Sequence, residues 1–361
     1  MMPMSGSQPL LVHTESSLAW GGQEIRIFTE LKELTRFGWK VELWAPERSE
    51  LFVRAKSARM PVEPVPFRRT LDICSMYTVR KLISDRKADL IVTHSSIDSW
   101  VIGLATRCLS RPPKIVRTRH LSTPIRNGLS YRWFPDAICT TSRAISEMLT
   151  QLGISGNKIQ CIATGVDLSR FRPNPSKKME MRKKYGLPED RPVVGGVFVI
   201  RSWKGIFDFV KIVLAVPKAH FVVAGDGPSR DAMVHAAENL GVERRISFVG
   251  HVEMVEEIFW AMDVFLFPSN ANEGIPQAVL QAQACGVPAV VSNLPSIQEA
   301  STHARFCAPG DAAHFAHSIH ELLDDPNLAR QLAESELADV KRFDQSEILR
   351  RIDRFYRGLI Q

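Results

Sequence analysis

Long apolar runs are missing from this sequence. A helix that spans a bilayer needs roughly 20 consecutive apolar residues, and no stretch of the 361 residues comes near that length. Residues 1–6 also place no basic segment ahead of the brief apolar run of residues 9–12, as a secretory leader would. We therefore expect a protein located in the cytoplasm.

Clusters of cysteine and histidine are missing too. The six cysteines show no CxxC spacing, there is no HExxH motif, and neither His94 nor His251 has a partner at ligand spacing. These absences argue against a zinc site and against a disulfide framework. We expect no metal, and reduced thiols buried as small apolar side chains at Cys74, Cys108, Cys139, Cys161, Cys285 and Cys307.

Two common nucleotide-binding signatures are also absent. No GxGxxG motif follows the strand that opens either half of the chain, which disfavours a dinucleotide-dependent oxidoreductase. No GxxxxGK motif followed by Ser or Thr is present, which disfavours an enzyme that hydrolyses nucleoside triphosphates.

The composition, by contrast, provides enough apolar material for two cored domains, with 45% hydrophobic and 24% charged residues. Positive charge is concentrated in the first half. Residues 1–172 contain 25 Lys and Arg against 15 Asp and Glu, a net charge of +10, which leaves 21 against 24, or −3, for the remainder. We infer that the two halves face different partners.

One segment of the first half is strongly basic. Residues 99–135 contain seven Lys or Arg and no acidic side chain. The segment predicts a positive potential and suits a phosphate-bearing partner, but a solvated basic face without a specific ligand explains the charge equally well. The seven residues are Arg107, Arg111, Lys114, Arg117, Arg119, Arg126 and Arg132.

Strand and helix patterns alternate through the first half. Alternation of this kind predicts parallel strands joined by crossover helices, hence an open, doubly wound α/β sheet with ligands at the carboxyl ends of the strands. The first helix has its apolar positions at Ile25, Phe28, Leu31 and Leu34 and ends at Gly38. Strands are predicted at residues 10–13, 40–45, 89–93 and 114–118, with further helices before residue 89 and at 97–108.

The same alternation repeats after a charged, proline-bearing segment, residues 173–190, which we interpret as a linker. We predict two tandem Rossmann-like domains, residues 1–172 and 191–344, and a final amphipathic helix within 345–361 that lies across the gap between them. In the second domain the predicted strands are 193–200, 220–224, 245–249, 264–267 and 289–292, and the helices 206–215, 229–240, 255–261 and 276–284.

Residues 262–292 form the most informative segment. A polar loop carries Glu273, Pro276 suits a first helical position and Gly286 suits the helix end. The backbone N–H groups of Gly274, Ile275 and Gln277 would then be unpaired at a helix N-terminus, which attracts anionic groups such as a diphosphate.

A second polar side chain, Gln281, follows Glu273 after eight residues. At a helical rise of roughly 1.5 Å per residue, this spacing corresponds to about 12 Å, comparable to the span of a nucleotide sugar from its sugar to its ribose. One element could therefore hold both ends of such a molecule.

Taken together in their order, these motifs resemble the retaining, family 4 type of glycosyltransferase with the GT-B fold, in which a nucleotide sugar binds between two Rossmann-like domains. The resemblance covers nearly the whole chain. Its carriers are Gly21-Gly22-Gln23-Glu24, His120, residues 163–171 (ATGVDLSRF), Arg201 with Lys204-Gly205, Gly225-Asp226-Gly227-Pro228, Phe248-Val249-Gly250 and residues 273–288.

The resemblance implies a role for each matched residue. Arg201 and Lys204 would neutralise the departing diphosphate, which charge-assisted contacts in a closed site stabilise. Glu273 would accept hydrogen bonds from hydroxyls of the donor sugar, and His120 would contact the sugar from the other side of the cleft. Gly21 and Gly22 would let the backbone approach the phosphates, and Gly250 would line the base.

The resemblance further implies a metal-independent reaction without a cofactor, because Lys and Arg stand in for the cation and the chain has no Asp-x-Asp pair. The leaving phosphate can itself help to remove the proton of the acceptor. The chain departs from the family pattern at Gln281, where Glu is usual, which removes a charge-assisted contact of roughly 1 kcal/mol. It also separates Arg201 and Lys204 by two residues, where four are usual.

These implications predict transfer of a hexose or related sugar from a nucleotide diphosphate sugar to a glycan or lipid-linked glycan, of the kind made in lipopolysaccharide biosynthesis. A peripheral contact with the anionic inner face of the membrane would involve the basic residues of the first half. Two alternatives remain: a sugar-nucleotide epimerase, which needs further placed carboxylates, and a non-catalytic nucleotide- or nucleic-acid-binding protein, although we expect no nucleic acid partner.

Overall fold

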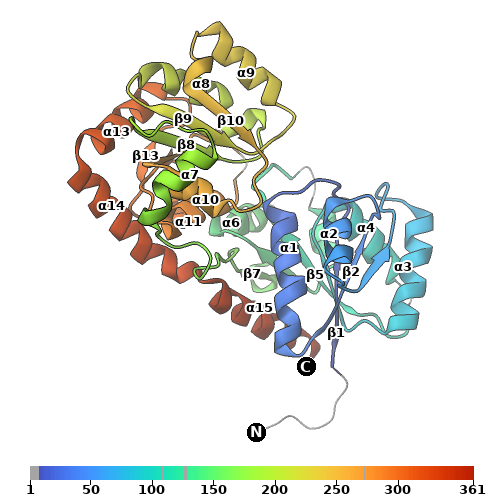
Figure 1. The fold of residues 1–361 in the computed structure, drawn as a ribbon. Coiled ribbons are helices and arrows are strands. Elements are labelled where there is room, and N and C mark those ends of the chain that lie inside the picture. Colours follow the sequence, from blue (N-terminus) through green and yellow to red (C-terminus); the bar gives the residue numbers. More distant parts are fainter. Residues whose placement is uncertain (1–7, 108, 126–127, 272) are drawn as a thin grey trace. The chain divides into compact units, whose positions relative to one another are not determined.

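The computed structural model describes residues 8–107, 109–125, 128–271 and 273–361. It divides into two units, Met1–Thr164 with Ser346–Gln361, and Gly165–Gln345 (Figure 1). The predictions that concern residues 1–6, Cys108, Arg126 and Asn272 lie outside the described residues.

The N-terminal unit is built on a parallel sheet of seven strands in the order β3-β2-β1-β4-β5-β6-β7. Each of the four predicted strands is confirmed to within one residue. Three further strands, each of three or four residues, were not predicted. The strands are β1 (Leu10–Thr14), β2 (Lys40–Ala45), β3 (Val62–Pro64), β4 (Leu90–Thr93), β5 (Lys114–Arg119), β6 (Ala137–Thr140) and β7 (Ile159–Cys161).

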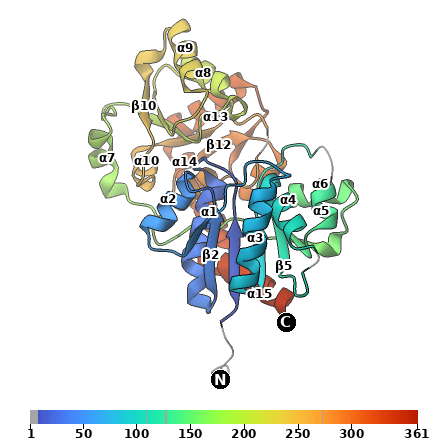
Figure 2. The ribbon, with the colours of Figure 1, turned by 90° about the vertical axis from the view of Figure 1, so that its right-hand side faces the viewer.

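Helices cover both faces of this sheet. They are α1 (Gly22–Glu33), α2 (Glu50–Ser57), α3 (Ile73–Arg86), α4 (Ser96–Ala105), α5 (Leu129–Trp133), α6 (Arg143–Gln151) and α15 (Gln345–Ile360). Figure 2 shows α3 and α4 side by side in front of the sheet. Because successive side chains of a strand point to opposite faces, β1 directs Leu10 and Val12 toward these two helices and Leu11 and His13 away from them.

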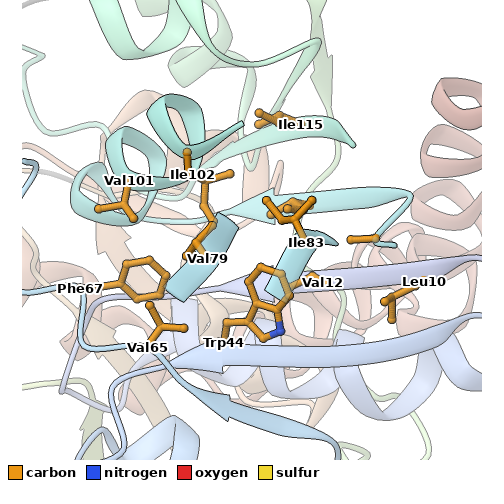
Figure 3. Close-up of a cluster of buried hydrophobic side chains, with 13 residues drawn as sticks. Leu10, Val12, Trp44, Val65, Phe67, Val79, Ile83, Val101, Ile102 and Ile115 are labelled. Carbon is orange, nitrogen blue, oxygen red and sulfur yellow. The ribbon is translucent and has the colours of Figure 1, made fainter. Parts of the chain in front are cut away.

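The core on the α3 and α4 face is apolar and closely packed. Val79 and Ile83 of α3 pack with Val101 and Ile102 of α4 over the indole of Trp44 (Figure 3). All of these side chains are at most 4% exposed, and burying each one stabilises the fold by about 1.5–3 kcal/mol.

The helix α1 covers the other face in a way that we did not predict. Ile25, placed on the apolar stripe, is 40% exposed, whereas Arg26 and Glu30 are buried. Arg26 Nε donates to Glu30 Oε1 at 2.7 Å, so the two charges neutralise each other inside the unit. The helix ends at Glu33, earlier than expected, and a 3-10 turn over Leu34–Phe37 follows, which Gly38 ends at φ +83°.

The helix α15 has the predicted bounds, and it packs on the N-terminal unit (Figure 1). Asp353 accepts a hydrogen bond from Trp39 Nε1 at 2.7 Å, Tyr356 donates to Glu30 at 3.1 Å, and Arg351 donates to the carbonyl of Cys161 at 3.1 Å. The last helix therefore completes the first unit.

The C-terminal unit has a parallel sheet of six strands in the order β10-β9-β8-β11-β12-β13. The two parallel sheets with their helices confirm the predicted α/β, Rossmann-like fold class. The strands are β8 (Val193–Val197), β9 (His220–Ala224), β10 (Ile246–Gly250), β11 (Val264–Phe267), β12 (Ala289–Ser292) and β13 (Arg305–Cys307). The helices are α7 (Lys178–Lys184), α8 (Ile206–Ala215), α9 (Arg230–Asn239), α10 (Glu256–Ala261), α11 (Gln277–Ala284), α12 (Pro295–Ala300), α13 (Ala312–Asp324) and α14 (Pro326–Asp339).

The segment that we interpreted as a linker is packed structure of the C-terminal unit. Arg182 is buried, and its guanidinium donates to the carbonyl of Ala261 at 3.0 Å and to Asp263 at 2.5 Å. Before it, Arg170 forms an ion pair with Glu256 at 2.6 Å. Because these contacts attach residues 165–190 to the second sheet, the units divide after Thr164 rather than after residue 172.

Candidate functional site

The loops at the carboxyl ends of β8 and β11 form one side of a candidate site in the C-terminal unit. The first loop carries Arg201 and Lys204 and ends at Gly205, which has φ +69°. A Cβ atom built on Gly205 would lie 1.9 Å from the carbonyl oxygen of Pro268, so only glycine allows the two loops to meet. The backbone N–H of Asn270 then donates to the carbonyl of Trp203 at 2.7 Å.

This close approach brings together Lys204 and Glu273, the two residues to which we assigned the chemistry. Lys204 Nζ lies 2.6 Å from Glu273 Oε1, and the same oxygen accepts a hydrogen bond from the hydroxyl of Ser269. The side chains are 16% and 5% exposed. An ion pair with so little water around it is a strong local dipole, with its cation open on one side.

Arg201 lies in the same loop as Lys204, and its guanidinium contacts an aromatic ring. Its Cζ lies 5.1 Å from the centre of the Trp203 ring, in a cation–π contact. Among the described residues we find no carboxylate or carbonyl that accepts a hydrogen bond from this guanidinium. A rigid cation without an acidic partner next to a second cation suits a ligand with two negative charges.

The start of α11 supplies further donors close in sequence to Glu273. Within the described residues, no backbone hydrogen bond is found for the N–H groups of Gly274 and Ile275, but both residues precede the N-cap of the helix. Gln277 differs, because it already has a polar partner within the chain. Pro276 is the N-cap, with extended backbone, rather than the first helical residue.

This late helix start corrects the predicted 12 Å span between Glu273 and Gln281. The helical rise applies only from Gln277 onward, since Glu273 lies in the preceding loop. Gln281 itself is half-buried on α11. Its separation from Glu273 therefore does not follow from helix geometry.

Gly250 and the turn at Gly225-Asp226-Gly227 lie at neighbouring strand ends. The N–H of Gly225 donates to the carbonyl of Gly250 at 2.7 Å, at the end of β10. Asp226 accepts from the N–H of Gly227 at 2.7 Å, which fits the structural role expected for it. A Cβ on Gly227 would lie 2.4 Å from the carbonyl of Ile200, so this turn packs against the strand that leads to Arg201.

In the N-terminal unit, Gly21 and Gly22 form the start of α1. Gly21 is the N-cap and offers no side-chain acceptor, so the first N–H groups of the helix lack a side-chain cap. A Cβ on Gly22 would meet no atom within 4 Å. The chain itself therefore gives no steric reason for glycine at position 22.

His120 follows β5 and is 8% exposed. Its Nε2 lies 3.0 Å from Nδ1 of His94, and Nε2 of His94 lies 2.9 Å from Nδ1 of His13. Burial, with Arg26, Arg117 and Arg119 nearby, holds the pKa of His120 well below its ordinary value, so the imidazole is neutral at pH 7.

The basic segment 99–135 is less available than its composition suggests. Arg117 is 1% exposed, donates to the carbonyl of Ser95 and lies 3.8 Å from Asp98. Lys114 is paired with Asp136 at 3.0 Å. Arg117 therefore contributes little to the surface charge of the segment, whereas Arg107, Arg111 and Arg132 are exposed.

The cysteine prediction holds in part. Cys139, Cys285 and Cys307 are buried and free, whereas Cys74 is exposed. Within the described part of the chain, no three His, Cys, Asp or Glu side chains come together in a way that could hold a metal ion. No helix of the described residues is long and apolar enough to cross a bilayer.

Sequence reasoning missed His13, Glu30 and the ordering of His94 beside His120. A signal was available, because the three histidines stand at the ends of the segments that became β1, β4 and β5, and these strands are neighbours in the sheet. Recognising it required the strand order, which the sequence alone does not give.

Comparison with known proteins shows which family the chain belongs to. Residues 20–170 match the family model Glycosyltransferase Family 4, and residues 177–337 match Glycosyl transferases group 1. The chain belongs to the family 4 glycosyltransferases. The two matches cover the Gly21-Gly22 loop and His120 on one side, and Lys204 and Glu273 on the other.

Curated members of the family align with parts of the chain. It is 29% identical over 243 residues to the UDP-Gal:alpha-D-GlcNAc-diphosphoundecaprenol alpha-1,3-galactosyltransferase of Escherichia coli, which covers 62% of each chain. It is 30% identical over 196 residues to the 2-deoxystreptamine glucosyltransferase of Streptomyces kanamyceticus, 52% of this chain and 50% of that one. The alignments thus span about half to three fifths of these relatives.

Solved structures establish the fold of this family member. Anabaena HepE in complex with UDP-glucose superimposes with a TM-score of 0.87 at 18% identity, over 97% of this chain and 100% of that chain. The likeness confirms the predicted GT-B fold.

Proposed function

We propose that this protein transfers a sugar from a nucleotide diphosphate sugar to a glycan or lipid-linked glycan acceptor, with retention of the anomeric configuration and without a metal ion. The observation that carries the proposal is the 2.6 Å contact between Lys204 and Glu273, beside an Arg201 that stacks on Trp203. Two cations and one carboxylate at the ends of two neighbouring strands match the charges and hydroxyls of such a donor.

The chemistry divides between the two members of the pair. The diphosphate gains negative charge as the bond to the sugar breaks, and the ammonium of Lys204 with the guanidinium of Arg201 stabilises that charge. Glu273 accepts hydrogen bonds from hydroxyls of the sugar, which orients the anomeric carbon. An oxygen of the leaving phosphate takes the proton of the acceptor hydroxyl, so the site needs no second carboxylate.

The two alternatives find little support. An epimerase would need further carboxylates free to move protons, and Asp208, the other acid in contact with this loop, accepts a hydrogen bond from Asn270 at 2.9 Å. A nucleic-acid-binding protein would expose its basic segment, whereas Arg117 and Lys114 are paired with acids.

A transfer assay with purified protein tests the proposal. The protein is incubated with a panel of nucleotide diphosphate sugars and an undecaprenyl-diphosphate-linked sugar, the acceptor class named for the Escherichia coli relative. We expect an elongated product whose new linkage has the anomeric configuration of the donor, formed equally in the presence of EDTA. An inverted linkage or loss of product with EDTA would contradict the mechanism, and no product with any donor would contradict the activity.

We further propose that the protein meets its lipid-linked acceptor at the anionic face of the membrane through α3. This helix exposes Ile73 at 78% and Tyr77 at 73%, and Leu71 before it is 63% exposed. Four exposed cations, Arg68, Arg69, Arg80 and Lys81, lie around these apolar side chains. Apolar groups enter the headgroup region while each cation near an anionic surface contributes about 1 kcal/mol.

Sedimentation with phosphatidylglycerol vesicles tests the membrane contact. The double variant Arg68→Ala, Arg69→Ala should bind less than the wild type at low ionic strength, and Tyr77→Ser should also bind less. The variant Arg350→Ala, Arg354→Ala, which removes the same charge from α15, is the matched control and should bind as the wild type. Equal loss in both double variants would show a non-specific charge effect and overturn this part of the proposal.

A further inference from the structure

A line of buried polar groups runs through the N-terminal unit from α15 to His120. Tyr356 donates to Glu30 Oε2 at 3.1 Å, and His13 Nε2 lies 3.7 Å from the same oxygen. His13 and His94 then lead to His120 through contacts of 2.9 Å and 3.0 Å between ring nitrogens. The planes of neighbouring rings differ by 17° and 29°, with centroids 5.2 Å and 5.3 Å apart, so the rings meet edge to edge through their nitrogens.

Each imidazole in this line is neutral and carries one proton. Burial lowers the pKa of His13 to about 4, although Glu30 acts in the opposite direction. Burial also holds the pKa of His94 well below its ordinary value. A neutral imidazole has one N–H donor and one acceptor nitrogen.

This single proton permits only two arrangements of the line. His94 contacts a histidine through each of its nitrogens, so it must donate to one neighbour and accept from the other. Either all three protons point toward Glu30, or all three point away from it. The first arrangement makes every ring an Nε2–H tautomer, and the second makes every ring an Nδ1–H tautomer.

The carboxylate of Glu30 decides between the two arrangements. Both of its oxygens already accept from donors, Oε1 from Arg26 and Oε2 from Tyr356, as expected of a carboxylate. In the second arrangement the lone pair of His13 Nε2 would face Oε2 in a buried space, where two acceptors repel each other. In the first arrangement an N–H points toward the carboxylate.

We propose that Glu30 sets the tautomers of His13, His94 and His120, so that Nδ1 of His120 is an acceptor for a hydroxyl of the substrate. The proposal rests on the proposed function for the existence of that hydroxyl. Glu30, His13 and His94 are positioning residues, and His120 is the member of the line that meets the substrate. In this state His120 cannot serve as a cation for the phosphates, and that role falls to Lys204 and Arg201.

The substitution Glu30→Gln reverses the line. Arg26 Nε still needs an acceptor, so the amide oxygen takes the place of Oε1 and the amide NH₂ takes the place of Oε2. His13 Nε2 then accepts from the amide, and all three rings change to the Nδ1–H tautomer. Tyr356→Phe removes a hydrogen bond from the same carboxylate but keeps its charge, and it should leave the tautomers unchanged.

Long-range ¹H–¹⁵N spectra of the full chain labelled with ¹⁵N-histidine read the tautomers directly, without donor or acceptor. We expect Nε2–H at the three rings in the wild type and in Tyr356→Phe, and Nδ1–H at the three rings in Glu30→Gln. An Nδ1–H tautomer at His94 in the wild type would overturn the proposal, and this measurement stands even where Glu30→Gln does not fold. Unchanged tautomers in a folded Glu30→Gln would overturn it too.

Transfer kinetics separate this inference from the proposed function. Glu30→Gln should lower kcat/KM by about fivefold to tenfold, the value of one net hydrogen bond, while Tyr356→Phe should change it little. Reversed tautomers with unchanged kcat/KM would contradict the role of His120 toward the substrate. A wild type without any transfer but with Nε2–H rings would contradict the proposed function alone, since the proton arrangement would still hold.

Discussion

At the scale of single residues, the account depends on the pairing of Lys204 with Glu273. In the free protein each charge is neutralised by the other, with both side chains largely removed from water. A buried charge left without its partner is costly, so the pair keeps both groups in place until a donor arrives. The proposed function requires that the same geometry present the ammonium to a phosphate and the carboxylate to hydroxyls.

Glu273→Gln should lower the rate of transfer by about a hundredfold, because a carboxylate that accepts from sugar hydroxyls is replaced by a neutral group. The measurement is kcat in the transfer assay, with the free energy of unfolding determined alongside. Asp231→Asn, a change of the same kind at a side chain that is 92% exposed, is the control and should keep the wild-type rate. A folded Glu273→Gln protein with nearly native kcat would show that the carboxylate is misassigned.

Two glycines, one in each unit, should respond in opposite ways to substitution. Gly22→Ala meets no atom of the chain, so we expect wild-type stability with donor binding weakened at least tenfold where the new methyl group excludes a phosphate. Gly205→Ala clashes with the carbonyl of Pro268 at φ +69° and should lower the free energy of unfolding by more than about 1 kcal/mol. Unfolding curves and donor titrations of both variants check this pair. Unchanged donor affinity in Gly22→Ala would remove the phosphate role of that loop.

The sequence singled out these residues because each is marked by its type and its neighbours. Gly274 and Glu273 follow a buried strand and precede a proline and a helix, and that order alone places unpaired N–H groups beside an acid. Ser269 and Trp203 escaped prediction, since their roles arise only where two loops meet. The meeting itself depends on Gly205, whose positive φ no pattern in the sequence specifies.

At the scale of elements, several helices and strands were predicted with their observed bounds. The helix α15 and the strands β2, β9, β11 and β12 have the predicted bounds. The helix α1 shows why the prediction of buried side chains can fail. We predicted that an apolar stripe is buried, but the helix instead buries an ion pair between Arg26 and Glu30. Periodicity finds an element, but it does not reveal which polar residues pair inside the fold.

The docking of α15 gives a stability prediction. Tyr356 is 1% exposed, and its ring contacts Trp39 edge to face with centroids 6.4 Å apart. Tyr356→Ala should therefore lower the free energy of unfolding by about 3–5 kcal/mol. Arg354→Ala, on the exposed side of the same helix, should change it by less than about 0.5 kcal/mol. Urea unfolding of both variants makes the comparison, and equal stability of the two would show that α15 is not docked as described.

The ends of β1, β4 and β5 give a pH prediction. The pKa of His13 falls to about 4 in the folded protein. Between about pH 6.5 and pH 4, the imidazole is therefore protonated in the unfolded chain and neutral in the folded protein. The stability contributed by neutral His13 is complete above pH 6.5 and is lost as the pH falls toward 4. As the pH falls from 6.5 to 5, the free energy of unfolding of His13→Asn should therefore decrease by about 2 kcal/mol less than that of the wild type.

Urea unfolding at the two pH values measures this difference in the free energy of unfolding. Burial also raises the pKa of Glu15 to about 8 and that of Glu336 well above its ordinary value. The stability that these two neutral acids contribute is lost as the pH rises, which is the opposite pH dependence. These acids are present in both proteins, so their effect cancels in the comparison. Parallel pH profiles of the wild type and His13→Asn would contradict the burial of a neutral ring.

At the scale of the whole molecule, the sequence predicted two sheets of parallel strands, but the predicted boundary between the two units differs from the observed one. Residues 173–190 were interpreted as a linker because they are charged and contain prolines, and residues 165–172 were assigned to the first domain. Their charges are instead satisfied by acids of the C-terminal unit, as Arg170 is by Glu256. Charge counts along the chain likewise overstated the basic surface, since they cannot show that Arg117 is buried beside Asp98.

The central claim is that Lys204 binds the diphosphate of a nucleotide sugar. Titration calorimetry of the sugar nucleotides selected in the transfer assay, against the wild type, Lys204→Ala and Lys211→Ala, tests it most directly. Lys211 is a 61% exposed lysine of α8 and serves as the matched control. We predict that Lys204→Ala weakens binding by at least tenfold, while Lys211→Ala binds as the wild type does. Wild-type affinity in a folded Lys204→Ala protein would contradict the account.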